Sequence, residues 1–307
     1  MLAFFANIFG YVLKLLYNIV GNYGWAIILF SIIVKVVMIP ISIKQQKTMK
    51  KNEKIQNELK QIQFKYKNEP EKLNQEMMAL YKREGMSPLS GCLSSIIQII
   101  LLFSVFLLVR QPLTYMVKMD KDVISKMEHI VTEQNSNTKG AYNEIAVIQY
   151  VRNLKNNTSE KEENAEKKED FDINEYSNQA SLNMDFFGID LTQVPSNNLT
   201  DIKTLIIPIL YVISSFISIR LTSATTNKKK KEENKLITDG TEQEERYNPT
   251  EDMNKTMVWM MPIMSVTIAI IAPLGLALYW LMNNILMIIE RLTINRILIK
   301  EEAEENA

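Results

Sequence analysis

The sequence predicts an all-α integral membrane protein with five transmembrane helices and a cytosolic helical hairpin. Two observations support this fold class. Apolar runs of about 20 residues, the length a helix needs to cross a bilayer core, are separated by charge-dense segments along the 307-residue chain. Within those runs the apolar residues are nearly continuous, whereas a soluble domain alternates apolar and polar residues at helix or strand period. An ordinary soluble domain is therefore excluded.

Residue types that serve catalysis or metal binding are scarce in this chain. It has one cysteine, Cys92, and one histidine, His129. A single cysteine excludes a disulfide framework and a cysteine-cluster metal site. The lone histidine lies in a polar segment, and the nucleotide-binding pattern G-x-x-x-x-G-K-[ST] does not occur. We therefore predict no metal, no other cofactor, no enzymatic activity and no DNA partner.

Residues 1–23 form the first element and are predicted to be an amphipathic helix at the membrane surface. They are mostly apolar but carry Lys14, and Gly21 separates them from the next apolar run. An additional membrane span is the alternative interpretation. A cleaved signal peptide is not expected, because neither a basic n-region nor a small-residue cleavage site is visible.

Five apolar stretches follow that are long enough to cross a bilayer, the last two as a tight pair. The first is interrupted only by Lys35. The final stretch is too long for one helix, and Pro273 and Gly275 mark a turn within it. The predicted spans are 24–43, 89–109, 202–223, 257–272 and 273–295.

The distribution of charge predicts how these spans are oriented. Residues 44–84 carry 11 basic and 6 acidic side chains, whereas residues 111–201 carry 9 basic and 16 acidic ones. Basic segments next to spans remain in the cytosol, which places the N-terminus outside and the C-terminus inside. The connecting segments are then a cytosolic hairpin at 44–88, an extracellular loop with a variable insert at 110–201, a cytosolic loop at 224–256 and an acidic cytosolic tail at 296–307.

The cytosolic segment after the first span is predicted to be two antiparallel helices. Ile55, Leu59 and Ile62 fall on one helical face, and Asn68 to Pro70 form a turn before the second helix. The hairpin either only packs on itself or also offers a basic contact surface to a nascent chain or a ribosome. The candidate contact residues are Lys47, Lys50, Lys51, Lys54 and Lys60.

Lys35 is the most informative polar residue inside a span. An isolated charge there costs about 2.5 to 3.5 kcal/mol on insertion scales, so it suggests a functional role. Lys44 is the next lysine, which places Lys35 about 13 Å below the cytosolic end of its helix at 1.5 Å per residue. No carboxylate lies in the central part of any span. We therefore expect Lys35 to lack an ion-pair partner and to face water.

Other spans also carry polar stripes, which together with Lys35 predict a hydrated cavity between the helices. Any one stripe alone is better explained by hydrogen bonds between helices. The residues expected to line the cavity are Ser31, Lys35, Ser94, Ser95, Gln98, Tyr211, Ser215, Ser218, Tyr279, Trp280, Asn283 and Asn284.

Four blocks of the sequence resemble the YidC/Oxa/Alb family of membrane protein insertases. They are GNYGWAIILFSIIVKVVMIPISIKQQKTMKK, GMSPLSGCLSSIIQ, MDFFGIDLT and MMPIMSVTIAIIAPLGLALYWLMNNI. The blocks stand in the order of the family and, with the segments they delimit, cover roughly two-thirds of the chain. The combination is specific, whereas each block alone is a weak signal.

The resemblance implies a five-helix bundle with a hydrophilic groove that is open to the cytosol and to lipid. It implies insertion and folding of newly made membrane proteins in a bacterial plasma membrane, alone or with the Sec translocon. The family usually carries Arg at the position of Lys35, and commonly Pro at the position of Ser94. Some members use a basic tail to bind ribosomes, but Glu301 to Glu305 make this tail acidic.

Two other function classes are compatible with parts of this pattern. An ion or solute transporter would also need polar stripes, but the chain shows neither an internal repeat nor an acidic relay in its spans. An intramembrane enzyme could pair Lys35 with a serine of the second span, but no G-x-S-x-G or H-E-x-x-H motif supports it.

Overall fold

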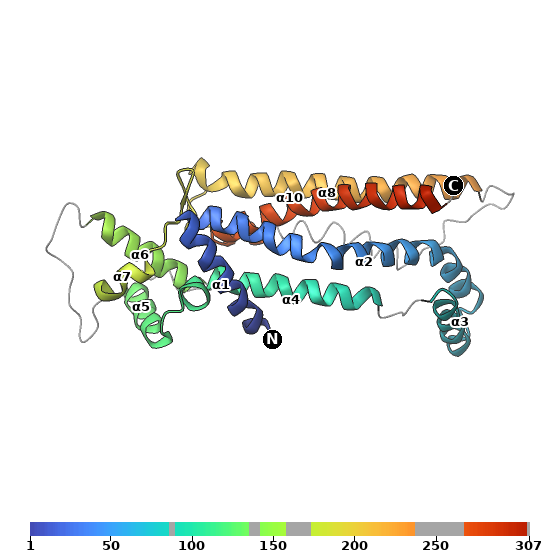
Figure 1. The fold of residues 1–307 in the computed structure, drawn as a ribbon, viewed down its shortest axis with the longest axis horizontal. Helices are drawn as coiled ribbons and strands as arrows, with labels where there is room; N and C mark the ends of the chain where they lie inside the picture. The colour runs from blue at the N-terminus through green and yellow to red at the C-terminus, as the bar shows by residue number, and fades with distance from the viewer. Residues whose placement is uncertain (86–89, 135–141, 158–172, 237–266, 306–307) are drawn as a thin grey trace.

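The structure, a computed structural model, describes residues 1–85, 90–134, 142–157, 173–236 and 267–305. Nearly all of its regular secondary structure is helical, in agreement with the all-α prediction. The molecule is elongated (Figure 1): long helices run along its length, short helices α5 to α7 gather at one end, and a helical hairpin lies at the other end. These two ends are called the α5–α7 end and the hairpin end.

Four long helices form the body of the molecule (Figure 1). Helix α10 packs against both α2 and α8, whereas α4 packs against α2 and the N-terminal helix α1. Helix α2 begins at the α5–α7 end, where the side chain of Asn22 accepts a hydrogen bond from the backbone N–H of Trp25 and caps the first turn. The bounds of the long helices are Tyr23–Lys65 for α2, Ser90–Arg110 for α4, Ile202–Leu236 for α8 and Leu274–Glu305 for α10.

Three of the described helices are long and apolar enough to cross a membrane, judged by length and composition. They are Leu2–Val20, Tyr23–Thr48 and Ile202–Leu221, and a shorter apolar helix covers Ile99–Arg110. Most of the predicted span 257–272 lies outside the described residues. The count of five spans therefore stays a prediction.

Helix α1 (Leu2–Val20) packs across α4, α2 and the π-helix η1 (Leu113–Val117). Contact is close at Gly10, where an added Cβ would lie 1.9 Å from the backbone carbonyl oxygen of Tyr115. The opposite face exposes Phe4, Tyr11 and other large apolar side chains. This apolar face suits either a surface-lying helix or a span, so the surface placement of residues 1–23 also stays a prediction.

The predicted cytosolic hairpin consists of the last third of α2 and of helix α3 (Pro70–Arg83). Helix α2 passes from the apolar span into the hairpin without a break, although it contains Pro40. Ile55, Leu59 and Leu80 form a small core between the two helices. Side chains on the predicted apolar face therefore hold the hairpin together. Ion pairs exposed on its surface contribute little to its stability.

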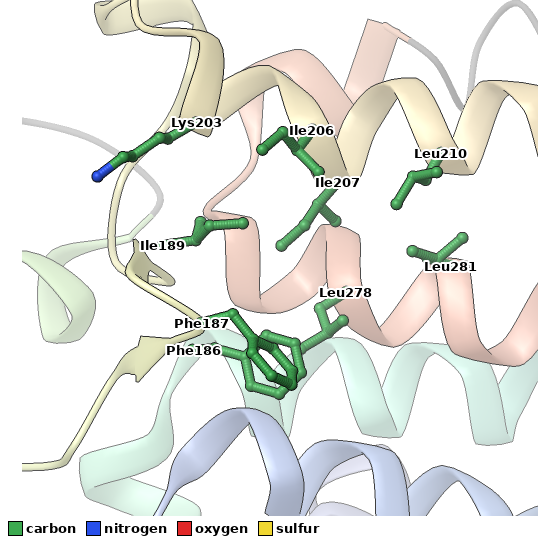
Figure 2. Close-up of a pocket in the computed structure, with 9 residues that line it drawn as sticks. All are labelled: Phe186, Phe187, Ile189, Lys203, Ile206, Ile207, Leu210, Leu278 and Leu281. Carbon is green, nitrogen blue, oxygen red and sulfur yellow. The ribbon is translucent and has the colours of Figure 1, made fainter.

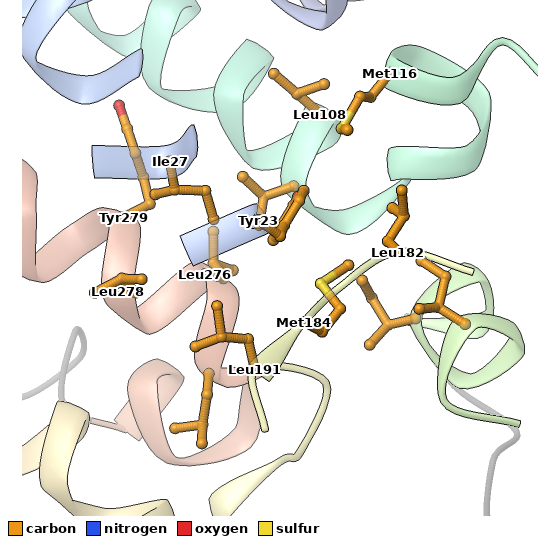
Figure 3. Close-up of a cluster of buried hydrophobic side chains, with 14 of the residues drawn as sticks. Tyr23, Ile27, Leu108, Met116, Leu182, Met184, Leu191, Leu276, Leu278 and Tyr279 are labelled. Atoms are coloured by element: carbon orange, nitrogen blue, oxygen red, sulfur yellow. The ribbon is translucent and has the colours of Figure 1, made fainter. Parts of the chain in front are cut away.

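The predicted extracellular loop contains several short elements that pack at the α5–α7 end (Figure 1). Figure 3 shows the core beneath them, in which Tyr23, Leu108, Met184, Leu191 and Leu276 come together from separate parts of the chain. The elements are α5 (Lys121–Gln134), α6 (Asn143–Asn157), α7 (Ile173–Ala180), the antiparallel strands β1 (Asp185–Phe186) and β2 (Ile189–Asp190), and the 3-10 helix η3 (Pro195–Asn197).

Candidate functional site

Lys35 forms an ion pair with Glu290, and the expectation that it lacks a partner is wrong. Its Nζ lies 2.6 Å from Oε2 of Glu290, and the two side chains are only 16% and 9% exposed. Helices α2 and α10 run side by side and start at the same end of the molecule (Figure 1). Lys35 and Glu290, 12 and 16 residues from those starts, are therefore brought to similar depths.

Glu290 is the principal functional candidate that the sequence interpretation missed. It directly follows the apolar run that ends at Ile289 and lies toward the end of the predicted span 273–295, so it was not counted among the residues of the central part of a span. Helix α10 continues unbroken to Glu305, and the Glu290 side chain on it is only 9% exposed. A signal was present, because Asn283 and Glu290 are seven residues apart and share one face of a helix.

A second polar group joins α8 to α10 through Asn284. Its side-chain Nδ2 donates hydrogen bonds to the hydroxyl oxygens of Ser214 and Ser215, each over 3.0 Å. Ser214 in turn donates to the backbone carbonyl of Tyr211, 2.8 Å away. All four residues are buried. At this place the structure favours hydrogen bonding between helices, the alternative to lining a hydrated cavity. Ser214 joins Ser215 and Asn284 in this polar group, although it was not among the predicted lining residues.

The other predicted residues lie near these two groups or outside the described side chains. Ser31 is buried and donates to the carbonyl of Ile27 in its own helix. Trp280 is half-buried, and its ring centroid lies 6.3 Å from that of Tyr211. Tyr279 is buried, while Ser218 and Asn283 are half-buried. The structure describes the backbone of α4 at Ser94, Ser95 and Gln98 but not these side chains, so the groove stays a prediction.

The predicted basic contact residues of the hairpin are described only in part. Lys47 and Lys51 lie on α2 and are exposed. The side chains of Lys50, Lys54 and Lys60 lie outside the described set. The contact surface for a nascent chain or ribosome therefore stays a prediction.

An apolar cavity of about 400 Å³ lies near the α5–α7 end, between the β1–β2 hairpin, α8 and α10. Figure 2 shows Phe187 and Ile189 from the β1–β2 hairpin facing Ile207 of α8 and Leu278 of α10, with Lys203 at the margin. This cavity lies away from Lys35 and carries little polar surface. Its lining suits apolar groups and offers no catalytic side chain.

Together, the apolar helices of membrane-spanning length and the buried ion pair between two helices define an α-helical membrane protein. The sequence profile of the 60Kd inner membrane protein family matches residues 15–302. The chain therefore belongs to the 60Kd inner membrane protein family.

Bacterial relatives named membrane protein insertase YidC are similar to parts or most of the chain. The Helicobacter pylori (strain ATCC 700392 / 26695) protein is 44% identical over 106 residues, which is 34% of this chain and 19% of that protein. The Treponema denticola protein is 26% identical over 286 residues, which is 93% of this chain and 36% of that protein. The chain thus spans about a third or less of the length of these relatives.

Proposed function

We propose that the protein is a non-enzymatic membrane protein insertase and chaperone, which inserts newly made membrane proteins and helps them fold. The observation that carries the proposal is its membership of a family whose similar members are named insertases. The buried pair of Lys35 and Glu290 supports it, because ionisable groups between apolar helices mark functional sites. The substrates are nascent membrane proteins, handled alone or beside the Sec translocon.

The proposed mechanism separates the polar and apolar parts of a substrate. A hydrophilic tail enters a groove between the helices, where the charge of Lys35 attracts acidic residues. The apolar segment moves along the exposed apolar face of α8, on which Ile209, Ile213 and Phe216 follow one another at helical spacing. Transfer of an apolar helix into lipid is favourable by itself, so the protein only lowers the barrier for the polar tail and needs no nucleotide.

The proposed orientation is that deduced from the charge pattern, with the N-terminus outside and the C-terminus in the cytosol. The hairpin end then lies in the cytosol, where the exposed Lys47 and Lys51 meet a nascent chain or a ribosome. The α5–α7 end lies outside and closes the groove on that side. Cleavage of a protease site placed in α3 from the cytosolic side only would support this orientation, whereas cleavage from outside would contradict it.

Reconstitution in liposomes tests the proposed activity. The substrate is a single-span protein with an acidic N-terminal tail, and protease protection of the tail reports insertion. We expect protection with the wild type and with Lys35→Arg, and strongly reduced protection with Lys35→Ala. A second substrate that does not insert into empty liposomes is the control for spontaneous insertion. Equal protection of this substrate with and without the protein would refute the proposed function.

A further inference from the structure

Lys35 is the cation to which the proposed mechanism binds an acidic substrate residue. In the structure, Glu290 already forms an ion pair with this lysine. Nζ and Oε2 are 2.6 Å apart, the distance of a direct charge-assisted hydrogen bond. Both side chains are largely buried. Arg291, the next residue on α10, also interacts electrostatically with Glu290. An acidic substrate residue therefore meets a lysine that already has a carboxylate partner.

The second oxygen of Glu290 is not satisfied. Oε1 is buried and accepts no hydrogen bond from any residue that the structure describes. A purely structural buried ion pair is favourable only when the remaining lone pairs are hydrogen-bonded as well. Glu290 is therefore held by one oxygen, and its release into water would satisfy both oxygens. This geometry is that of a carboxylate that can be exchanged.

We propose that Glu290 is a resident counter-ion that holds the site of Lys35 until a carboxylate of the substrate displaces it. This inference rests on the proposed function and deepens it. Exchange of one carboxylate for another keeps the number of ion pairs constant, so an acidic tail can take the place of Glu290. Glu290 thus competes with acidic tails for Lys35, whereas the binding of neutral tails, which form no ion pair with Lys35, does not depend on it.

A structural role for the pair predicts a different result from a competing role. If Glu290 only joined α2 to α10, its neutralisation would weaken binding of all tails alike. If it competes for Lys35, its neutralisation strengthens binding of acidic tails and leaves neutral tails unchanged. Close charge pairs contribute enough coupling that removal of the competitor should raise the affinity for an acidic tail at least about tenfold.

Direct peptide binding to the full chain in nanodiscs measures this selectivity without requiring insertion. The probes are a fluorescent tail peptide with three aspartates and its matched peptide with three asparagines, and anisotropy gives each Kd. The variants are Glu290→Gln, Glu290→Asp, Lys35→Gln and the double variant Lys35→Gln/Glu290→Gln. The matched control is Glu58→Gln, which removes the same charge from the exposed hairpin pair with Arg83. Circular dichroism checks that each variant is folded.

We expect Glu290→Gln to bind the aspartate peptide at least about tenfold more tightly than the wild type, with no change for the asparagine peptide. Glu290→Asp keeps the charge on a shorter side chain, so its effect should be smaller and of the same sign. Glu58→Gln should match the wild type. Both variants with Lys35→Gln should lose the preference for aspartate.

Two results would overturn the inference. One is an unchanged ratio of the two affinities in both Glu290 variants. The other is a gain from Glu290→Gln that persists in the double variant, because it would not act through Lys35. The proposed function fails separately: liposome insertion absent in the wild type, with the peptide selectivity as expected, would reject the insertase and retain the exchange.

Discussion

Truncation of Glu144 to alanine tests how the α5–α7 end is attached to the long helices. The first amides of a helix lack partners within the helix, and at the start of η1 this need is met from α6. The carboxylate of Glu144 accepts hydrogen bonds from the backbone N–H of Leu113 over 2.7 Å and of Thr114 over 3.0 Å. It also accepts one from the hydroxyl of Thr114 over 2.6 Å. Glu144 is only 2% exposed, so water does not readily replace it.

The magnitude follows from the donors that Glu144→Ala leaves behind. The threonine hydroxyl can rotate to another acceptor, whereas the two amides cannot. Each buried donor without a partner costs about 1–3 kcal/mol. We therefore expect Glu144→Ala to lower the free energy of unfolding by about 2–5 kcal/mol, allowing for partial solvation of the Thr114 amide.

Thermal unfolding in detergent and hydrogen exchange measure this effect together. Faster exchange is expected at the amides of Leu113 and Thr114 in particular. The control is Glu133→Ala, because Glu133 lies in an exposed contact with His129 and should change stability by less than about 0.5 kcal/mol. Equal stability of the two variants, with unchanged exchange at η1, would refute the view that Glu144 fastens α6 to η1.

Three further predictions follow from single contacts. Burial raises the pKa of the Glu144 carboxyl more than its hydrogen bonds lower it. The stability linked to it is therefore complete below its ordinary value of 4.5 and is lost as the pH rises through the raised pKa. Glu144→Gln should flatten that part of the dependence of the melting temperature on pH, and an unchanged dependence would contradict this. Glu128 is the charged group next to Glu144 and is kept in both proteins. Gly10→Val should lower the free energy of unfolding by about 1–3 kcal/mol or displace α1, because the new Cβ would meet the backbone carbonyl of Tyr115. Ala3→Val, at an exposed site on the same helix, should do neither. Asn284→Ala should lower the free energy of unfolding by about 0.6 to 2 kcal/mol, because its hydrogen bonds to α8 are lost. An unchanged melting temperature would exclude that contribution.

The length of apolar runs and hydrophobic periodicity account for the parts of the fold that could be predicted. The first span follows from the length of its apolar run, and the hairpin face with Ile55 and Leu59 follows from helical spacing. The short helices at the α5–α7 end could not be placed in this way. Helix α6, for example, buries Ile145, Ile148 and Val151 within a predominantly polar loop. Their burial is decided by distant partners in the core, which a local pattern does not contain.

The candidate site shows the same division between local and distant information. Lys35 stands out locally because a charge interrupts an apolar run. The hydrogen bonds from Asn284 to α8 join residues about 70 positions apart on two helices, and the sequence offers only the polar types and their spacing. Glu290 is the clearest case, because it lies toward the end of the predicted span 273–295 and was not counted among the polar residues that line the cavity. Continuous helix and close packing on α2 place this carboxylate inside the structure instead.

Because Lys35 is paired with Glu290, a single substitution that removes the charge of Lys35 also affects Glu290. Lys35→Ala removes the cation and also leaves the carboxylate of Glu290 buried without its partner, which is costly in its own right. A loss of activity in this variant therefore combines two effects, the missing attraction for the substrate and a disturbed packing of α2 on α10. Lys35→Arg keeps the charge, and the double neutral variant removes both charges together. If the double variant folds as well as the wild type but does not distinguish acidic tails, the role of Lys35 is recognition, and the stability of the helix pair is separate from it.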